Sequence, residues 1–127
     1  MLNNDLGNVM SKDNSITVHE VANIANSSVI KVLDTTLIEY KYIALCRISA
    51  TFTLSTSRPA GALFSFADIA PTGISALGNI IDTNGNLVSR FYLGVSSVVD
   101  PDGNKYVENL SAIQAGTYYI NEVCSLK

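Results

Sequence analysis

The stretch GNIIDTNGNLVSRFYLGVSSVVDPDGNKYVENLSAIQAGTYYINEVCSL, residues 78–126, decides the fold. In it, short runs of apolar, β-branched and aromatic residues alternate with Asn84-Gly85, Asp100-Pro101-Asp102-Gly103 and Ala115-Gly116. Asn and Gly both tolerate positive φ, as a two-residue type I′ hairpin loop requires. The second segment has the residues that a type I turn favours, with Asp first, Pro second and Gly fourth. The stretch therefore predicts an antiparallel sheet.

The preceding residues continue the strand pattern. From Tyr42 to Leu54 apolar residues alternate with polar ones, which predicts a strand with one face buried. Further strands are expected at residues 28–33, 63–67 and 87–95, the last with Leu87, Phe91, Leu93 and Val95 toward the core, and turns are expected at 34–36 and 70–73. Residues 16–19 are interpreted as a short strand and residues 19–26 as a helical turn, on too few residues for periodicity to decide.

Strand segments that recur about every 8–15 residues are typical of a sandwich or a barrel. We therefore predict an all-β fold, an antiparallel β-sandwich of jelly-roll-like type with a short N-terminal arm or helical turn. The arm or linker is assigned to residues 1–14 and a single sandwich domain to residues 15–127.

The composition is poor in charge. Of the 127 residues, 47% are hydrophobic and only 15% are charged, whereas ordinary soluble domains have roughly 25% charged residues. Charge-depleted, apolar surface is typical of subunit interfaces. We therefore expect a homo-oligomer, with a monomer that has a large core as the alternative.

Charge and hydropathy also limit the partners. The net charge is −3 and the eight basic residues are scattered singly, so no nucleic-acid partner is expected. No apolar run is long enough for a membrane-spanning helix, and residues 1–5 lack the basic and apolar blocks of a signal peptide. We expect neither membrane insertion nor export by a signal peptide.

The two cysteines, Cys46 and Cys124, lie in apolar, strand-like runs. A free cysteine behaves as a small buried hydrophobe, and this interpretation is favoured. A disulfide would require the two strands to be neighbours with suitable Cβ geometry, which the sequence leaves open.

Catalytic and metal-binding patterns are sparse. His19 is the only histidine and is interpreted as a surface residue. Asp100, Asp102 and Asn104 have an alternating spacing that calcium loops use, but Asp in a Pro-Gly turn is favoured simply because its side chain caps the turn. No cofactor, metal ion or catalytic residue is assigned, and an enzyme is not expected.

Aromatic residues suggest a binding surface instead. Tyr118-Tyr119 places one ring on each face of a strand, and Tyr92 and Tyr106 are further candidates for the outer face. Exposed Tyr beside Arg and Asn is the chemistry of saccharide recognition. For any single Tyr, cross-strand packing or a subunit interface is the favoured alternative. Side-chain chemistry and strand parity select four candidate ligand-binding residues: Arg90, Tyr92, Asp102 and Tyr106.

Residues 111–120, Ser-Ala-Ile-Gln-Ala-Gly-Thr-Tyr-Tyr-Ile, resemble the closing strand of the β-sandwich head domains of bacteriophage tail fibres and baseplate receptor-binding proteins. Residues 78–88 are similar to the strand, Asn-Gly turn and return strand of these domains, and residues 68–73 resemble their Pro-containing loop. The resemblance covers residues 42–126. The chain departs from the pattern because it has no Trp and because its Pro loop lacks aromatic and basic residues, so no binding residue is transferred from the family.

This resemblance implies a non-catalytic, homotrimeric module that binds host cell-surface carbohydrate. It also implies a virion protein that meets other virion proteins, is assembled in a bacterial cytoplasm and has reduced cysteines. Two alternatives from other classes are kept: a purely structural virion or baseplate assembly domain, and a polysaccharide hydrolase that uses a pair such as Asp100 and Asp102.

Overall fold

The computed structural model describes residues 16–69 and 74–126, and the predicted all-β antiparallel class is confirmed. The predicted arm at 1–14 and the predicted turn at 70–73 lie outside the described residues. The elements are β1 (Ile16–His19), β2 (Val21–Ile24), β3 (Ile30–Tyr40), the 3-10 helix η1 (Lys41–Ile43), β4 (Leu45–Leu54), β5 (Gly61–Phe66), β6 (Ile74–Asp82), β7 (Leu87–Leu93), β8 (Tyr106–Asn109) and β9 (Gly116–Leu126).

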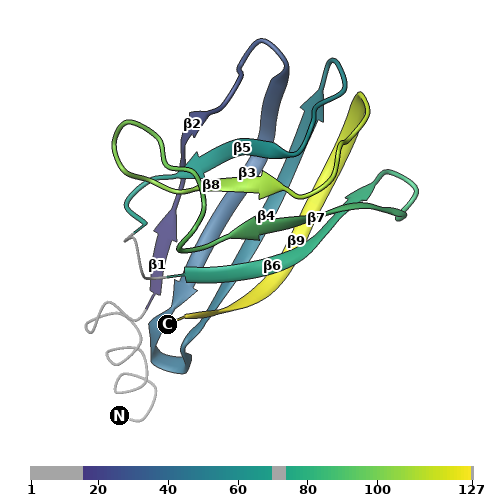
Figure 1. The fold of residues 1–127 in the computed structure, drawn as a ribbon. Helices are drawn as coiled ribbons and strands as arrows, with labels where there is room; N and C mark the ends of the chain where they lie inside the picture. Colours follow the sequence, from purple (N-terminus) through teal and green to yellow (C-terminus); the bar gives the residue numbers. More distant parts are fainter. Residues whose placement is uncertain (1–15, 70–73, 127) are drawn as a thin grey trace.

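The described residues form one nine-stranded sheet, in the order β1-β3-β4-β9-β6-β7-β8-β5-β2, which curls until it is nearly closed. It has two layers that face each other, as in the predicted sandwich (Figure 1). We call β1, β3, β4 and β9 the back layer, and β6, β7, β8, β5 and β2 the front layer. Glu20 links β1 of the back layer to β2 of the front layer, and its carbonyl oxygen accepts a hydrogen bond from the Ala67 N–H at 2.8 Å. The two ends of the sheet therefore meet at this corner.

The core fills the space between the layers. As the alternation predicts, Cys46, Ile48, Ala50, Phe52 and Leu54 on β4 all point inward and are buried. The ring centroid of Phe52 lies 5.8 Å from that of Phe64 and 5.8 Å from that of Tyr118, and those of Phe64 and Phe66 are 5.7 Å apart. These aromatic contacts join β4 and β9 of the back layer to β5 of the front layer.

Several local predictions are wrong. Asp34, Thr35 and Thr36 form no turn, because β3 continues through them with a bulge after Val32 and pairs with β4 along its whole length. Residues 21–24 form strand β2 instead of a helical turn, because they pair with β5 and lay Val21 and Ile24 against the core.

The inner face of β7 also differs from the prediction. Phe91 and Leu93 are buried as expected, but Leu87 is 59% exposed. Ile80 pairs with Ser89 and Ile81 with Leu87, so Val88 is a bulge on β7 and Leu87 lies on the outer face with Ile81. Val95 is exposed because it lies beyond the end of β7.

The β4 strand begins later than predicted. Tyr42 and Ala44 were expected on its buried face, but Tyr42 lies in η1 and Ala44 follows it in the left-handed region at φ 56°. Both side chains are exposed. A single 3-10 turn thus replaces the first residues of the predicted strand.

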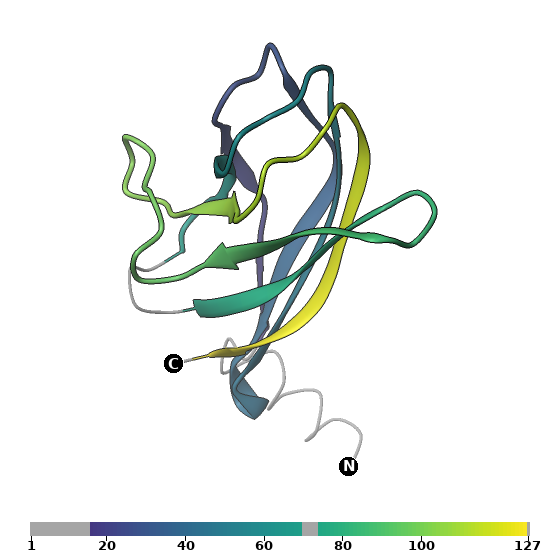
Figure 2. The same ribbon diagram turned by 45° about the vertical axis from the view of Figure 1, so that its right-hand side comes forward.

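The β6–β7 hairpin has a different turn from the one predicted. Only Gly85 has positive φ there (+81°), whereas a type I′ turn needs it at Asn84 as well. The Gly85 N–H donates to the Asp82 carbonyl at 3.0 Å and the Asp82 N–H to the Asn86 carbonyl at 3.0 Å. This is a three-residue loop, a type I turn followed by a left-handed glycine. Figure 2 shows the hairpin projecting from the body of the molecule.

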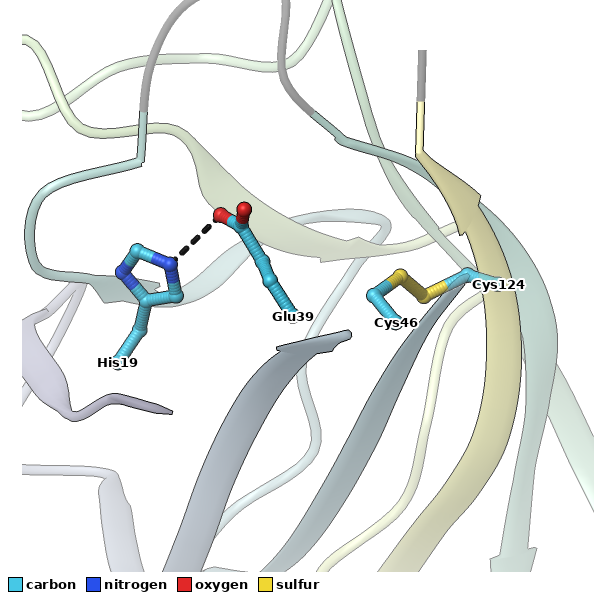
Figure 3. The surroundings of a disulfide bond; sticks show 4 residues. All are labelled: His19, Glu39, Cys46 and Cys124. Atoms are coloured by element: carbon cyan, nitrogen blue, oxygen red, sulfur yellow. Dashed lines mark hydrogen bonds and ion pairs between the residues drawn. A yellow bond between two sulfur atoms is a disulfide. The ribbon is translucent and has the colours of Figure 1, made fainter. Parts of the chain in front are cut away.

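The cysteines form a disulfide, so the favoured interpretation as free thiols is wrong. β4 and β9 are neighbours, and their register places Cys46 directly opposite Cys124, with a Cα–Cα distance of 5.0 Å (Figure 3). Both residues point into the interior and are buried. Pairing depended on the strand order, which the sequence does not contain.

His19 is also not a surface residue, since only 4% of it is exposed. Its Nε2 lies 2.7 Å from the Glu39 carboxylate on β3 (Figure 3). Its Nδ1 lies 2.7 Å from the Ala67 carbonyl oxygen beyond β5. Glu39 is the register partner of Cys46. The imidazole therefore bridges the back layer and the front layer at the corner where the sheet ends meet.

Candidate binding surface

The outer face of β7 and β8 collects most of the predicted ligand-binding residues. Arg90 and Tyr92 flank the buried Phe91 on β7, so both point away from the core. Tyr92 is the register partner of Glu108 on β8, and Tyr106 lies two residues before Glu108 on the same face. Strand register thus brings Arg90, Tyr92 and Tyr106 onto one continuous surface of the front layer.

Asp102 is not part of this surface by direct contact. It occupies the exposed tip of the turn before β8, and among the described residues its side chain has no hydrogen bond to Arg90, Tyr92 or Tyr106. Its backbone N–H donates to the Asp100 carboxylate at 3.0 Å. The structure therefore brings together three of the four predicted residues.

Glu108 was missed by the sequence analysis. It is half-buried on β8, and its register partners are Tyr92 on β7 and Ala62 on β5. The signal was present, because alternation through residues 106–109 places Glu108 on the outer face with Tyr106, and Val107 and Asn109 inside. Glu108 adds a carboxylate acceptor at the centre of the surface.

Local contacts orient these side chains. The Arg90 Nε donates to the Gly78 carbonyl oxygen at 3.3 Å, and the rest of this exposed side chain is free to reach a ligand. The Tyr92 ring lies over Gly94, where any Cβ would collide with it, and its hydroxyl lies 3.4 Å from the Ser96 Oγ. Gly94 is therefore needed for the position of the ring.

Tyr106 lies close to a buried negative charge. Burial, and then the charge of Asp100, raise the pKa of the Tyr106 hydroxyl above its ordinary value. A tyrosine hydroxyl is protonated at neutral pH even at its ordinary pKa, and this upward shift extends that state to higher pH, so the group is available as a hydrogen-bond donor.

Asp100 itself has a structural position. Its Oδ1 accepts the N–H groups of Asp102 and Asn104 at 3.0 and 2.9 Å, and its Oδ2 accepts the Ser65 hydroxyl at 2.7 Å and the Asn23 amide at 3.0 Å. Burial alone would raise the pKa of this carboxyl, but the hydrogen bonds outweigh burial and lower it to about 2. A carboxylate held ionised and fully engaged in this way suits neither a general acid nor a calcium ligand.

Other chemistry has little support at this surface. Within residues 16–69 and 74–126, no three His, Cys, Asp or Glu side chains gather as a metal-binding group. His19 lies at the corner between the layers, and both of its ring nitrogens already have acceptors. Of the helices in the described ranges, none is long and apolar enough to cross a membrane.

What the outer face of β7 and β8 offers is an aromatic ring, a guanidinium and a carboxylate on a shallow sheet. A Tyr ring stacks on the apolar face of a sugar, while Arg and Glu form hydrogen bonds with its hydroxyl groups. Comparison of the chain with protein-family models, with curated proteins and with solved structures found no match. The candidate site therefore rests on its own geometry.

Proposed function

We propose that this chain is a non-catalytic receptor-binding head of a bacteriophage tail fibre or baseplate, which binds host cell-surface carbohydrate as a homotrimer. The observation that supports this most is the shared outer face of Arg90, Tyr92, Glu108 and Tyr106 on β7 and β8. Such a shallow face suits weak recognition of a glycan, and several copies on one particle would multiply it through avidity. The proposal places the protein in the virion, after assembly in a bacterial cytoplasm.

The disulfide qualifies this proposal. Disulfides persist in oxidising surroundings and are rare in the cytosol. A virion protein made in a reducing cytoplasm would therefore close the Cys46–Cys124 bond only after the particle leaves the cell. The cysteines would thus be reduced during assembly and joined in a disulfide in the released particle, instead of staying reduced throughout.

The direct test is binding to immobilised bacterial polysaccharides: lipopolysaccharide O-antigens, capsular polysaccharides and wall teichoic acids. A soluble oligosaccharide from the polysaccharide that binds is then titrated against Arg90→Ala and Tyr92→Ala by calorimetry. We expect each variant to bind at least about tenfold more weakly, a loss of about 1.4 kcal/mol, and to keep the wild-type melting temperature.

Arg47→Ala is the matched control, because Arg47 is also an exposed arginine but lies on the back layer. Its affinity for the soluble oligosaccharide should equal that of the wild type. The proposal is wrong if no polysaccharide binds, or if Arg90→Ala and Arg47→Ala have the same effect. Release of glycan fragments during incubation would instead indicate an enzyme.

A second candidate is a purely structural virion or baseplate assembly domain. It is favoured by the apolar outer face of the back layer, where Tyr42, Ile43 and Val123 are each more than 60% exposed. Capture of a virion protein, together with no binding to any polysaccharide, would support this alternative.

A further inference from the structure

The outer face of the back layer carries an apolar patch at the η1 end. Its six members are large apolar side chains whose exposure ranges from 36% to 67%: Ile16, Val18, Tyr42, Ile43, Leu45 and Val123. We call it the η1 patch. Exposed apolar groups that gather in this way mark interaction sites, whereas single exposed apolar residues are ordinary.

Register shows that the patch is continuous. One row across the strands runs from Ile16 on β1 through Tyr40 on β3 to Leu45 on β4. The next row runs from Val18 through Ile38 and Arg47 to Val123 on β9. Because register partners share a face of the sheet, all of these side chains point to the same side. β1, β3, β4 and β9 lie side by side in Figure 1.

The patch contains a hollow of about 240 Å³, lined by Tyr40, Ile43, Leu45, Cys46, Arg47 and Val123. Ligand pockets usually have about 300–1,000 Å³, so this one is small for a free ligand. A protein side chain is a better match for it. Tyr42 projects from η1 beside the hollow and is 65% exposed. One surface thus offers both a hollow and a large projecting side chain.

Charge argues against an ionic partner. Two cations lie at the patch. Arg47 lines its hollow, and the Arg47 Nε and Nη2 already donate to the Asn121 Oδ1 at 3.3 and 3.2 Å; exposed Lys41 is in η1 beside Tyr42. A nucleic acid or an acidic peptide would need several such cations. The patch suits an uncharged, apolar surface of similar shape, and the η1 patch of another copy is such a surface.

The extent of the face also fits association. Outward residues of β1, β3, β4, β9 and η1 number about twenty, close to the roughly 20–30 residues on each side of a stable interface. Toward the other end of these strands the face becomes rich in hydroxyl groups, with Ser49, Thr51, Thr53 and Thr117. An apolar centre with a polar margin is the usual anatomy of an interface.

We propose that the η1 patch is the interface between copies of this chain. The inference deepens the proposed function and rests on it for the setting, because a head with several copies needs a surface that joins them. Tyr42 of one copy enters the hollow of the next, and the front layers with their β7–β8 faces remain free for the ligand.

The test is sedimentation velocity of the whole chain over a micromolar concentration series, with Val123→Glu and Ile43→Glu as variants. The wild type should sediment as an oligomer, and each variant should associate at least about tenfold more weakly, because a carboxylate would be buried among apolar groups. An unchanged circular dichroism spectrum would show that the exposed substitution leaves the fold intact, whereas the melting temperature should fall as association weakens.

Leu87→Glu is the matched control, since Leu87 is 59% exposed on β7 outside the patch. It should associate like the wild type. A monomeric wild type, or an oligomer that survives both patch variants, overturns the interface. The sedimentation results do not depend on the proposed glycan site, which lies on the other layer. Val123→Glu should therefore bind the soluble oligosaccharide with the wild-type affinity per subunit. If the wild type is an oligomer but binds no glycan, only the proposed function is refuted, and the interface stands.

Discussion

Two turns of this molecule share a five-residue pattern and a backbone geometry. Asp82–Asn86 reads Asp-Thr-Asn-Gly-Asn, and Asp100–Asn104 reads Asp-Pro-Asp-Gly-Asn. In both, the fourth residue is a glycine with positive φ, at +81° and +86°. The glycine N–H donates to the carbonyl of the first Asp, and the Oδ1 of that Asp accepts the N–H groups of the third and fifth residues.

Their surroundings differ. The Asp82 turn is the tip of the β6–β7 hairpin, and the Asp100 turn lies on the opposite side of the molecule in Figure 2. The Asp82 carboxylate accepts no further hydrogen bond among the described residues, whereas the Oδ2 of Asp100 also accepts the Ser65 hydroxyl on β5 and the Asn23 amide on β2. Local sequence therefore decides the shape of such a turn. Its surroundings decide whether its Asp also forms hydrogen bonds with other strands and so stabilises the rest of the fold.

The largest expected effect is that of Asp100→Ala. We expect a loss of about 3 kcal/mol in the free energy of unfolding, because the buried Ser65 hydroxyl and the half-buried Asn23 amide lose their acceptor. Urea unfolding followed by circular dichroism measures it. A loss no greater than that of Asp82→Ala would show that the two turns are energetically alike despite their surroundings.

The next largest effect should be the loss, at low pH, of the stability that Asp100 contributes. The pKa of Asp100 is lowered from 3.8 to about 2 in the folded protein. A lowered folded-state pKa gives stability that is present above the unfolded pKa and is lost as pH falls through the folded one, so this contribution should fade between about pH 4 and pH 2. Unfolding at a series of pH values should show a shallower dependence in this window for Asp100→Asn than for the wild type. Equal slopes would contradict the pKa assignment.

Replacing the glycine of each turn by alanine should lower the stability of the protein by the same amount. Gly85→Ala and Gly103→Ala each place a Cβ on a left-handed backbone, with nothing within 4 Å of either Cβ. The cost is thus backbone strain alone, about 1 kcal/mol in each case. Thermal unfolding of the two variants measures it, and a clearly unequal pair would mean that the two backbones are not equivalent.

The smallest effect should be that of Asp82→Ala, about 0.5–1 kcal/mol, because half-buried Asp82 stabilises only its own turn and water replaces its hydrogen bonds. The melting temperature should fall slightly and the unfolding transition should stay cooperative. A loss as large as that of Asp100→Ala would reveal a second role for this carboxylate, for example toward Tyr118, whose pKa is raised by burial and then by the Asp82 charge.

Periodicity predicted what depends on neighbouring residues along the chain. The buried face of β4 and the Asp100 turn followed from alternation and from turn chemistry. The same reasoning failed wherever a distant strand decides the outcome. Leu87 points outward because the pairing of β7 with β6 skips Val88, and His19 is buried because β3 and the chain after β5 close over it.

The candidate site divides in the same way. Strand parity placed Arg90 and Tyr92 correctly on one outer face, because parity is a property of a single strand. That Glu108 lies opposite Tyr92 depends on the pairing of β7 with β8, which no local pattern specifies. The separation of Asp102 from this surface follows from the buried Asp100, whose contacts hold the turn against β2 and β5.

The Cys46–Cys124 bond has a topological consequence. It turns residues 46–124 into a covalent ring that contains β5, β6, β7 and β8, while β1, β2 and β3 remain outside it. A protease that cuts the exposed 83–86 tip would leave both fragments linked, and they would separate on a gel only after reduction. The strands of the proposed glycan face are thus tethered in a way that one break in the backbone does not undo.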